Sequence, residues 1–248
     1  MKHTFGLIGF PLEHSWSPSY FQNRFRELGL KTTDYQLFSI KSLDNFSQFL
    51  ATTPNLRGLN VTIPYKQSIL TYLDTIDPAA REIGAVNTIT IERSGDDREL
   101  TGYNTDADGF ALSADFSKHT NALVLGTGGA SKAVTWALQK MGISFTLVSR
   151  SRYKNRAISY SDVNEAVMES HTLIINTTPV GMFPNTDDFP SLPYRCLTSQ
   201  HLLYDLVYNP EITAFMKQGM TYGASVQSGL SMLHHQAELA LKLFLDEG

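Results

Sequence analysis

The sequence predicts an α/β protein built from two domains. Three observations lead to this fold class. Short apolar runs alternate with helical patterns after Asp106, a glycine-rich turn at 126–129 joins one such run to a helix, and the part before 105 has a different pattern with a hairpin signal at 94–97. Strands that alternate with helices form βαβ units and a parallel sheet. A chain of 248 residues is long enough for two domains of this kind.

The first half of the chain is expected to mix strands and helices. Strands are expected at 5–8, 59–63 and 85–91, and a return strand at 99–103 follows the turn at 94–97. A first helix is expected to begin with Ser17 as its N-cap and Pro18 at its first position, and to end at Gly29. Two further helices are expected, one capped by Ser42 and one that starts at Pro64.

The second half is expected to hold a parallel sheet. Its apolar runs are 121–125, 145–148, 173–175 and 202–207, and the first of them leads through the glycine turn into a helix that ends near Met141. The last segment, 230–245, is a helix with an apolar stripe. The boundary near 105 depends on the change of pattern alone.

Composition narrows the class of protein. The formal net charge of −4 argues against a nucleic-acid surface, because a polyanion needs a basic face. Cys196 is the one cysteine, so neither an internal disulfide nor a zinc site of cysteine ligands is expected. No apolar run approaches ~18 residues, so no membrane span is expected, and residues 1–10 lack the long apolar region of a signal peptide. We expect a cytoplasmic enzyme or binding protein.

The glycine turn is the strongest local signal. It consists of Gly126, Thr127, Gly128, Gly129, Ala130 and Ser131, and it follows an expected strand and opens an expected helix. In this context glycines let backbone N–H groups approach a pyrophosphate at the helix N-terminus. Ser131 replaces the third glycine of the strict pattern, and a purely structural turn is the alternative. The context favours a dinucleotide site, and hence a doubly wound, Rossmann-like domain.

The end of the next strand indicates which dinucleotide is bound. An acidic residue there would hold the ribose hydroxyls of NAD, whereas an arginine accommodates the 2′-phosphate of NADP. The sequence has Ser149, Arg150 and Ser151 at this place, and no acidic residue before Asp162. Arginine makes bidentate, charge-assisted contacts with phosphate. NADP is therefore expected, and a solvated basic loop is the alternative.

Small hydroxyl and amide side chains are scattered through the first half, with one lysine and one aspartate among them. They are Ser15, Ser17, Asn60, Thr62, Lys66, Asn87, Thr88, Asn104, Thr105 and Asp106. Such a set suits a ligand with several hydroxyls and a carboxylate. Each residue alone is also common in turns and caps, as Ser17 and Thr62 would be before their expected helices.

Eight short motifs extend over nearly the whole chain. They are 9–11 with 14–18 (GFP, HSWSP), 60–66 (NVTIPYK), 84–88 (GAVNT), 102–106 (GYNTD), 126–131 (GTGGAS), 176–182 (NTTPVGM), 205–210 (DLVYNP) and, in the closing helix, Gly229, Met232, Leu233 and Gln236. In these motifs and in their order the chain resembles the shikimate dehydrogenase family.

The resemblance implies an activity and a division of labour. Members of the family transfer hydride between NADPH and the C3 carbonyl of 3-dehydroshikimate, which gives shikimate, an intermediate of aromatic amino acid biosynthesis. Residues 1–105 with 228–248 are then expected to form an α/β substrate domain and 106–227 the NADP domain, with a cleft between them. A monomer or homodimer is expected, whose partners are small molecules, without nucleic acid or membrane.

The resemblance also assigns roles to single residues. Lys66 and Asp106 match the family's catalytic lysine and its paired aspartate. The expected substrate residues are Ser15, Ser17, Asn60, Thr62, Asn87, Tyr208 and Gln236. The expected NADP residues are Gly126, Thr127, Gly128, Gly129, Ala130, Ser149, Arg150, Ser151, Thr177, Met182, Val207 and Gly229. No metal is expected.

Two departures and two alternatives remain. Ser149 stands where the family usually has asparagine, and Gln22, which we expect to be structural, also stands where asparagine is common. One alternative is a quinate/shikimate dehydrogenase that uses NAD, against which the Ser15–Ser17 pair and the basic loop argue. The other is a non-catalytic sensor of NADP and a polyol acid, against which Lys66 and Asp106 argue, because binding alone needs no proton donor.

Overall fold

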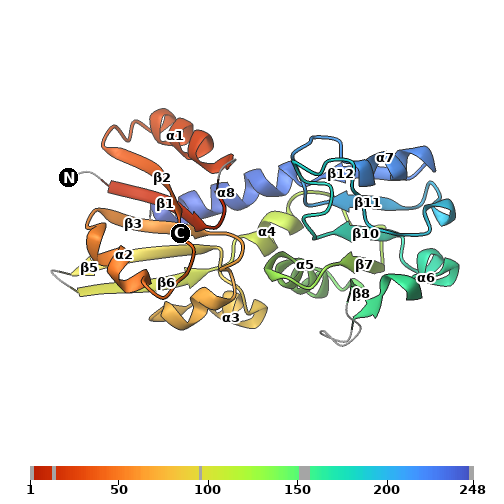
Figure 1. Cartoon of the computed structure of the whole chain (residues 1–248), viewed down its shortest axis with the longest axis horizontal. Helices are drawn as coiled ribbons and strands as arrows, with labels where there is room; N and C mark the ends of the chain where they lie inside the picture. Colours follow the sequence, from red (N-terminus) through yellow and green to blue (C-terminus); the bar gives the residue numbers. More distant parts are fainter. Residues whose placement is uncertain (1–2, 13–14, 95–96, 151–156, 246–248) are drawn as a thin grey trace. The chain divides into compact units, whose positions relative to one another are not determined.

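The computed structural model describes residues 3–12, 15–94, 97–150 and 157–245 (Figure 1). The chain divides into two compact units. Unit 1 is Met1–Thr105 with Ala237–Gly248, and unit 2 is Asp106–Gln236. The second division falls at Ala237, inside the helix α8 (Leu230–Phe244), whereas the sequence expectation put it at 228. Helix α8 therefore contributes residues to both units.

Unit 1 contains a mixed sheet. Its strands are β1 (His3–Gly9), β2 (Thr33–Ser39), β3 (Leu56–Val61), β4 (Thr75–Ile76), β5 (Thr88–Ser94) and β6 (Asp97–Tyr103), in the order β2-β1-β3-β5-β6-β4. Strands β1, β2 and β3 are parallel, while β5 runs antiparallel to both β3 and β6. The carboxyl ends of β1, β3 and β6 and the amino end of β5 consequently lie at one edge of this sheet.

The helices of unit 1 are short, and their starts differ from the expectation. They are α1 (Ser17–Glu27), α2 (Phe46–Thr52), the 3-10 helix η1 (Ser68–Tyr72) and α3 (Pro78–Ile83). Ser17 is not the N-cap of α1, because Trp16 holds that place without a side-chain cap, and the helix expected from Pro64 begins only at Ser68. Asn45, not Ser42, precedes α2, since the Ser42 hydroxyl accepts the Asp44 N–H instead.

Strand β1 is buried on both faces, which explains its continuous apolar run. On one face Phe5 and Leu7 pack with Phe21 of α1 and with the end of α8, through Ala237, Ala240 and Leu241. On the other face Ile8 packs with residues of α2 and β3. Burial of both faces is typical of parallel strands covered by helices.

Unit 2 is built on an all-parallel sheet. Its strands are β7 (Asn121–Leu125), β8 (Ser144–Ser149), β9 (Ile158–Ser159), β10 (Leu173–Asn176), β11 (Leu202–Asp205) and β12 (Ser225–Ser228), in the order β12-β11-β10-β7-β8-β9. The chain leaves β7 first towards β8 and β9, and then returns to the other side of β7 for β10 (Figure 1). This is the doubly wound order, and the predicted α/β fold class is confirmed.

The remaining elements of unit 2 connect these strands. They are α4 (Asp106–Ala111), α5 (Gly129–Lys140), η2 (Tyr160–Asp162), α6 (Glu165–Ser170), η3 (Tyr194–Cys196) and α7 (Ala214–Thr221), followed by α8. The core gathers Leu123, Leu125, Ile174, Leu203 and Phe215 from strands and helices. Within the described residues no helix has the length and apolar character needed to cross a bilayer.

Candidate functional site

The expected NADP residues lie where the strands of unit 2 end. The glycine turn follows β7, Ser149 closes β8 with Arg150 next to it, Thr177 follows β10, Val207 follows β11 and Gly229 follows β12. Met182 lies further along the segment that leaves β10, with 45% of its side chain exposed. Ligands of doubly wound sheets bind outside the carboxyl ends of the strands, near the strand at which the winding direction changes. Strand β7 is that strand here.

The glycine turn has the backbone that its sequence predicts. Gly126 has φ +113°, a conformation that side chains rarely adopt, and a Cβ there would lie 2.7 Å from Thr177 Oγ1. A Cβ on Gly128 would meet no atom within 4 Å, and Gly128 is the N-cap of α5 without a side-chain cap. The first-turn N–H groups of α5 thus have no capping side chain, which suits an anion.

Ser131 replaces the third glycine without loosening the turn. Its side chain is 2% exposed, and its hydroxyl donates to the carbonyl oxygen of Gly126 over 2.9 Å. Opposite it, the Thr177 hydroxyl donates to Leu125 O over 2.6 Å. The turn is therefore fastened at Gly126 and at Leu125 by two hydroxyl groups. This arrangement fits a dinucleotide phosphate, which would take the exposed backbone at Gly128.

A buried carboxylate fixes the neighbouring segments. Asp205, at the end of β11, accepts hydrogen bonds from Asn176 Nδ2 at 2.9 Å, from the Val207 N–H at 3.0 Å and from the Thr213 hydroxyl at 2.6 Å. Burial raises the pKa of Asp205 to about 6, against the effect of these three donors. Asn176 also donates to Val180 O at 3.3 Å. One side chain thus orders the segments that carry Thr177, Met182, Val207 and Tyr208.

Two further positions complete this edge. Gly229 lies against the backbone of Leu206, where an added Cβ would come within 2.5 Å of its carbonyl oxygen. Tyr208 is half-buried, and burial raises the pKa of its phenol. Of the three residues expected to bind the 2′-phosphate, the structure describes Ser149 and Arg150. Arg150 is exposed directly after β8, whereas Ser151 lies outside the described residues.

In unit 1 the expected substrate amides belong to one buried polar network. Asn60 of β3 pairs in register with Thr88 of β5, and its Nδ2 lies 3.2 Å from Thr88 Oγ1. Asn87 Nδ2 donates to Thr105 Oγ1 at 2.9 Å, and Asn87 Oδ1 accepts the Thr105 N–H at 2.8 Å. Thr105 directly precedes Asp106, so this network fixes the backbone next to the expected catalytic aspartate.

The other expected site residues of unit 1 follow the carboxyl ends of β1 and β3. Thr62 follows β3, and its N–H donates to Ile8 O of β1 at 2.9 Å. Ser15 and Ser17 open α1, where the Ser15 hydroxyl accepts the Ser17 N–H at 3.3 Å. Lys66 is half-buried, and its carbonyl oxygen accepts the N–H of Val86, next to Asn87, at 2.8 Å. Residues at and after these strand ends therefore include hydroxyls, amides and one lysine.

Three of the expected catalytic and substrate residues belong to unit 2, namely Asp106, Tyr208 and Gln236. Asp106 is the first residue of α4 and is buried. Gln236 is the last residue of unit 2, where its Nε2 donates to Leu233 O at 3.0 Å and its backbone packs closely on Gly109 of α4.

Sequence reasoning missed the residues that hold the site residues in place. Tyr35 contacts the expected site residue Asn60, and Asp205 contacts the expected site residue Val207, yet neither Tyr35 nor Asp205 was assigned a role. Thr105, which contacts Asn87, was placed in the polar set of the first half but was not assigned to the site. Thr105 and Asp205 lie inside quoted motifs, which was a usable signal. Tyr35 lies in β2, a strand that was not expected. Among the described residues no group of three or more histidines, cysteines or carboxylates is arranged to hold a metal ion.

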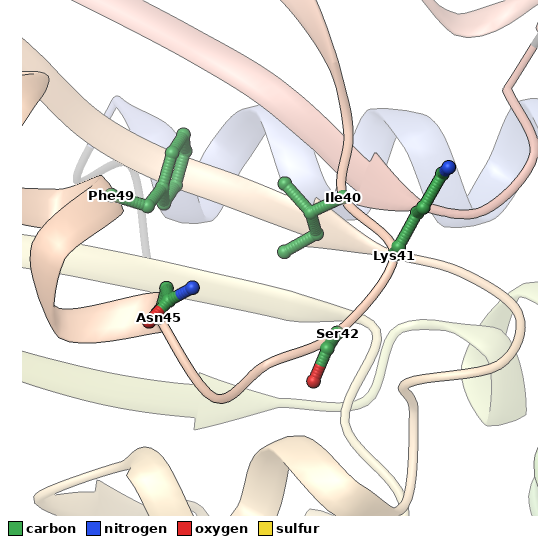
Figure 2. A pocket seen from close by; sticks show the side chains of 5 residues that line it. All are labelled: Ile40, Lys41, Ser42, Asn45 and Phe49. Atoms are coloured by element: carbon green, nitrogen blue, oxygen red, sulfur yellow. The ribbon is translucent and has the colours of Figure 1, made fainter.

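Two cavities lie away from these residues. One, of about 290 Å³, is formed between the segment after β2 and helix α2, where Ile40 and Phe49 line it with Lys41, Ser42 and Asn45 (Figure 2). The other, of about 480 Å³, lies at the amino ends of β10, β11 and β12, and its lining includes His119 and His201. Neither cavity includes an expected site residue.

The fold and the residues at the strand ends of the two sheets define the class of protein, an α/β dehydrogenase. One unit has the features of a dinucleotide-binding domain, and the other carries a set of hydroxyl and amide side chains. Comparison with known proteins gives the family. Residues 7–89 match the family "Shikimate dehydrogenase substrate binding domain". A shikimate dehydrogenase (NADP(+)) from Desulforamulus reducens is 35% identical, and the alignment covers 96% of this chain and 88% of the relative. The chain belongs to the shikimate dehydrogenase family.

Solved structures agree with this assignment. The shikimate 5-dehydrogenase of Thermus thermophilus, in complex with NADP(H) and shikimate, is 31% identical with a TM-score of 0.84, over 98% of this chain and 94% of that one. The quinate dehydrogenase of Corynebacterium glutamicum, in complex with NAD, is 26% identical with a TM-score of 0.86, over 99% and 94%. The fold is thus shared by enzymes with different substrates and cofactors.

Proposed function

We propose that this chain catalyses the reversible, NADP-dependent reduction of 3-dehydroshikimate to shikimate. The observation that carries the proposal is the agreement over nearly the full chain with an NADP-dependent shikimate dehydrogenase. The Thermus thermophilus shikimate 5-dehydrogenase, which has a similar fold, is in complex with NADP(H) and shikimate, and this supports the same reaction. The cytoplasmic location and the monomeric or homodimeric state stay predictions.

The described residues fit NADP. When bound, NADP accepts or supplies the hydride, and the protein supplies orientation and electrostatics. Gly126, Thr127, Gly128, Gly129 and Ala130 would hold the pyrophosphate at the N-terminus of α5, where no side chain caps the first turn. Arg150 and Ser149 would hold the 2′-phosphate, and Ser151, the next residue in the sequence, stays a prediction for the same role. Thr177, Met182, Val207 and Gly229 would line the rest of the cofactor.

The expected substrate residues would bind shikimate through hydrogen bonds. Ser15 and Ser17 would donate to the substrate carboxylate, while Asn60, Thr62, Asn87, Tyr208 and Gln236 would contact its hydroxyls and carboxylate. A site of this kind rejects analogues that lack a hydroxyl, because its own polar groups are then left unpaired.

Lys66 and Asp106 are the proposed catalytic pair. The carbonyl oxygen of 3-dehydroshikimate gains a proton as its carbon gains hydride, and Lys66 would donate that proton from its ammonium group. Asp106 would hold the ammonium in place and accept from a substrate hydroxyl. General acid–base assistance is worth roughly 10²–10⁴ in rate.

A cofactor and substrate panel tests the reaction. The purified chain is mixed with shikimate or quinate and with NADP or NAD, and the reduced cofactor is followed by absorbance. We expect the highest specificity constant for shikimate with NADP. A higher specificity constant for quinate with NAD would establish the rival activity, that of an NAD-dependent quinate dehydrogenase. The similar fold of the Corynebacterium glutamicum enzyme is the reason to test for it. Binding of shikimate and NADP without turnover would establish a sensor.

A double-mutant cycle tests the catalytic pair. Lys66→Ala and Asp106→Asn are measured singly and together, with turnover and NADP affinity as readouts. We expect Lys66→Ala to lower turnover by roughly 10²–10⁴ and to leave NADP affinity unchanged. The double variant should lose far less than the product of the two single losses, because the two groups act as a unit. Near-wild-type turnover of Lys66→Ala would refute the assignment.

A further inference from the structure

Tyr35 is a buried tyrosine that the reaction described above does not use. It lies in the middle of β2, opposite Phe5 of β1, and only 2% of its side chain is exposed. Its ring stacks on Phe21 of α1, with 4.4 Å between the centroids and 4° between the planes. Its backbone carbonyl oxygen lies 3.5 Å from Gln22 Nε2, also of α1. Tyr35 therefore joins β2 to the helix that Ser15 and Ser17 open.

The Tyr35 hydroxyl contacts an expected substrate residue directly. It donates to Asn60 Oδ1 over 2.7 Å. The other end of the Asn60 amide faces the Asn87 carbonyl oxygen at 3.4 Å and Thr88 Oγ1 at 3.2 Å. A carbonyl oxygen can only accept, so Nδ2 must point to Asn87 and Oδ1 to Tyr35. The network thus fixes which way the amide is turned, and the Tyr35 proton is committed to Asn60.

The orientation of this amide matters for a ligand. An amide oxygen accepts two hydrogen bonds, and Tyr35 supplies one of them. The second lone pair of Asn60 Oδ1 can accept from a ring hydroxyl only while the amide keeps this orientation. Burial raises the pKa of the Tyr35 phenol, and the nearby Ser17 side chain opposes this rise.

We propose that Tyr35 is a positioning residue for the substrate, which orients the Asn60 amide through its hydroxyl and holds α1, with Ser15 and Ser17, against the β1–β3 part of the sheet through its ring. The inference rests on the proposed function, since it concerns the same shikimate site. Tyr35 itself is too deeply buried to be a substrate contact. Its loss should therefore affect recognition of shikimate and not the chemistry of hydride transfer.

Tyr35→Phe isolates the hydroxyl, because phenylalanine keeps the ring and its stack on Phe21. Loss of one partner of a buried hydrogen bond changes an equilibrium constant by about fivefold to thirtyfold. We expect the KM for shikimate to rise by this factor. The kcat and the KM for NADP should stay within about twofold of the wild type, because these depend on other residues.

Tyr194→Phe is the matched control. Tyr194 is 7% exposed, and its hydroxyl donates to Pro190 O over 2.6 Å, so the same hydroxyl is removed from a similarly buried place in unit 2. Both variants should have a lower Tm. Only Tyr35→Phe should have a raised KM for shikimate, which separates positioning from mere stabilisation of the fold.

A second cycle tests the route through Asn60. In an Asn60→Ala background Tyr35→Phe should change the KM for shikimate by less than about twofold, since the amide that it orients is gone. The inference is overturned if Tyr35→Phe keeps the wild-type KM for shikimate, if the KM for NADP rises equally, or if its effect is undiminished in the Asn60→Ala background. Failure of the proposed function looks different, because the wild type would then not oxidise shikimate in the same assay.

Discussion

The buried carboxylate of Asp205 should make the stability of unit 2 depend on pH. Its pKa is raised from the ordinary 3.8 to about 6, chiefly by burial, while hydrogen bonds from Thr213, Val207 and Asn176 act in the opposite direction. The folded chain therefore binds this proton more tightly than the unfolded chain. Asp205 contributes stability that is fully present below pH 3.8 and is lost as the pH rises through about 6.

The size of this effect follows from the difference between the two pKa values. A change from 3.8 to about 6 corresponds to about 3 kcal/mol in the free energy of unfolding. Asp205→Asn removes the titration and keeps the geometry. Oδ1 still accepts from Asn176 and Val207. The bond to Thr213 reverses direction, because the Thr213 hydroxyl, which donates to Asp205 and accepts the Met216 N–H in the wild type, would turn its proton away and accept one from the new amide.

Urea unfolding of the wild type and of Asp205→Asn between pH 4 and 7 measures this difference. A Trp16→Phe background leaves Trp136 of α5 as the single tryptophan, so that fluorescence reports on unit 2. Relative to the wild type, the variant should gain up to about 3 kcal/mol as the pH rises from about 4 to about 6, and the difference should then level off. A difference that is constant over this range would refute the reasoning, since the carboxylate would then titrate alike in both states.

Two predictions concern the cofactor. Gly126→Ala should raise the KM for NADP and leave the KM for shikimate nearly unchanged. The reason is that a Cβ at φ +113° and 2.7 Å from Thr177 Oγ1 strains the turn by about 1–3 kcal/mol. Steady-state kinetics measures both KM values, and an unaltered KM for NADP would contradict the prediction. Arg150→Ala should raise the KM for NADP by roughly tenfold or more, the worth of a charged hydrogen bond, and should not change that for NAD; equal losses with both cofactors would exclude Arg150 as the 2′-phosphate ligand.

The sequence predicted β7, β8, β10 and β11 of the second half, because buried parallel strands are continuous apolar runs, but it did not predict β9 or β12. The run at 121–125 is β7 without a change of bounds. Strand β2 was missed because it has no such run, and Tyr35 is its one fully buried side chain. Helix α3 was also missed, although Asp77, whose carboxylate accepts two N–H groups, precedes Pro78, and Gly84 with φ 68° ends the helix.

The candidate site was predictable only at the level of single motifs. Most of the motifs follow the carboxyl end of a strand, as Thr177 does for β10 and Val207 for β11, whereas 84–88 leads into the amino end of the antiparallel strand β5. The topology of each sheet collects these strand ends at one of its edges. The supporting contacts are pairings between motifs. Tyr35 with Asn60, and Asn176 with Asp205 and Thr213, meet only through strand order and register, which a linear pattern does not contain.

The most direct test of the central claim is the fate of the hydrogen at C3 of shikimate. Shikimate deuterated at C3 is oxidised by the purified chain with NADP, and mass spectrometry locates the label. Hydride transfer predicts that the deuterium appears in the reduced nicotinamide and not in water. Loss of the label to solvent, or no reduced cofactor at all, would contradict the assignment of this chain as an NADP-dependent shikimate dehydrogenase.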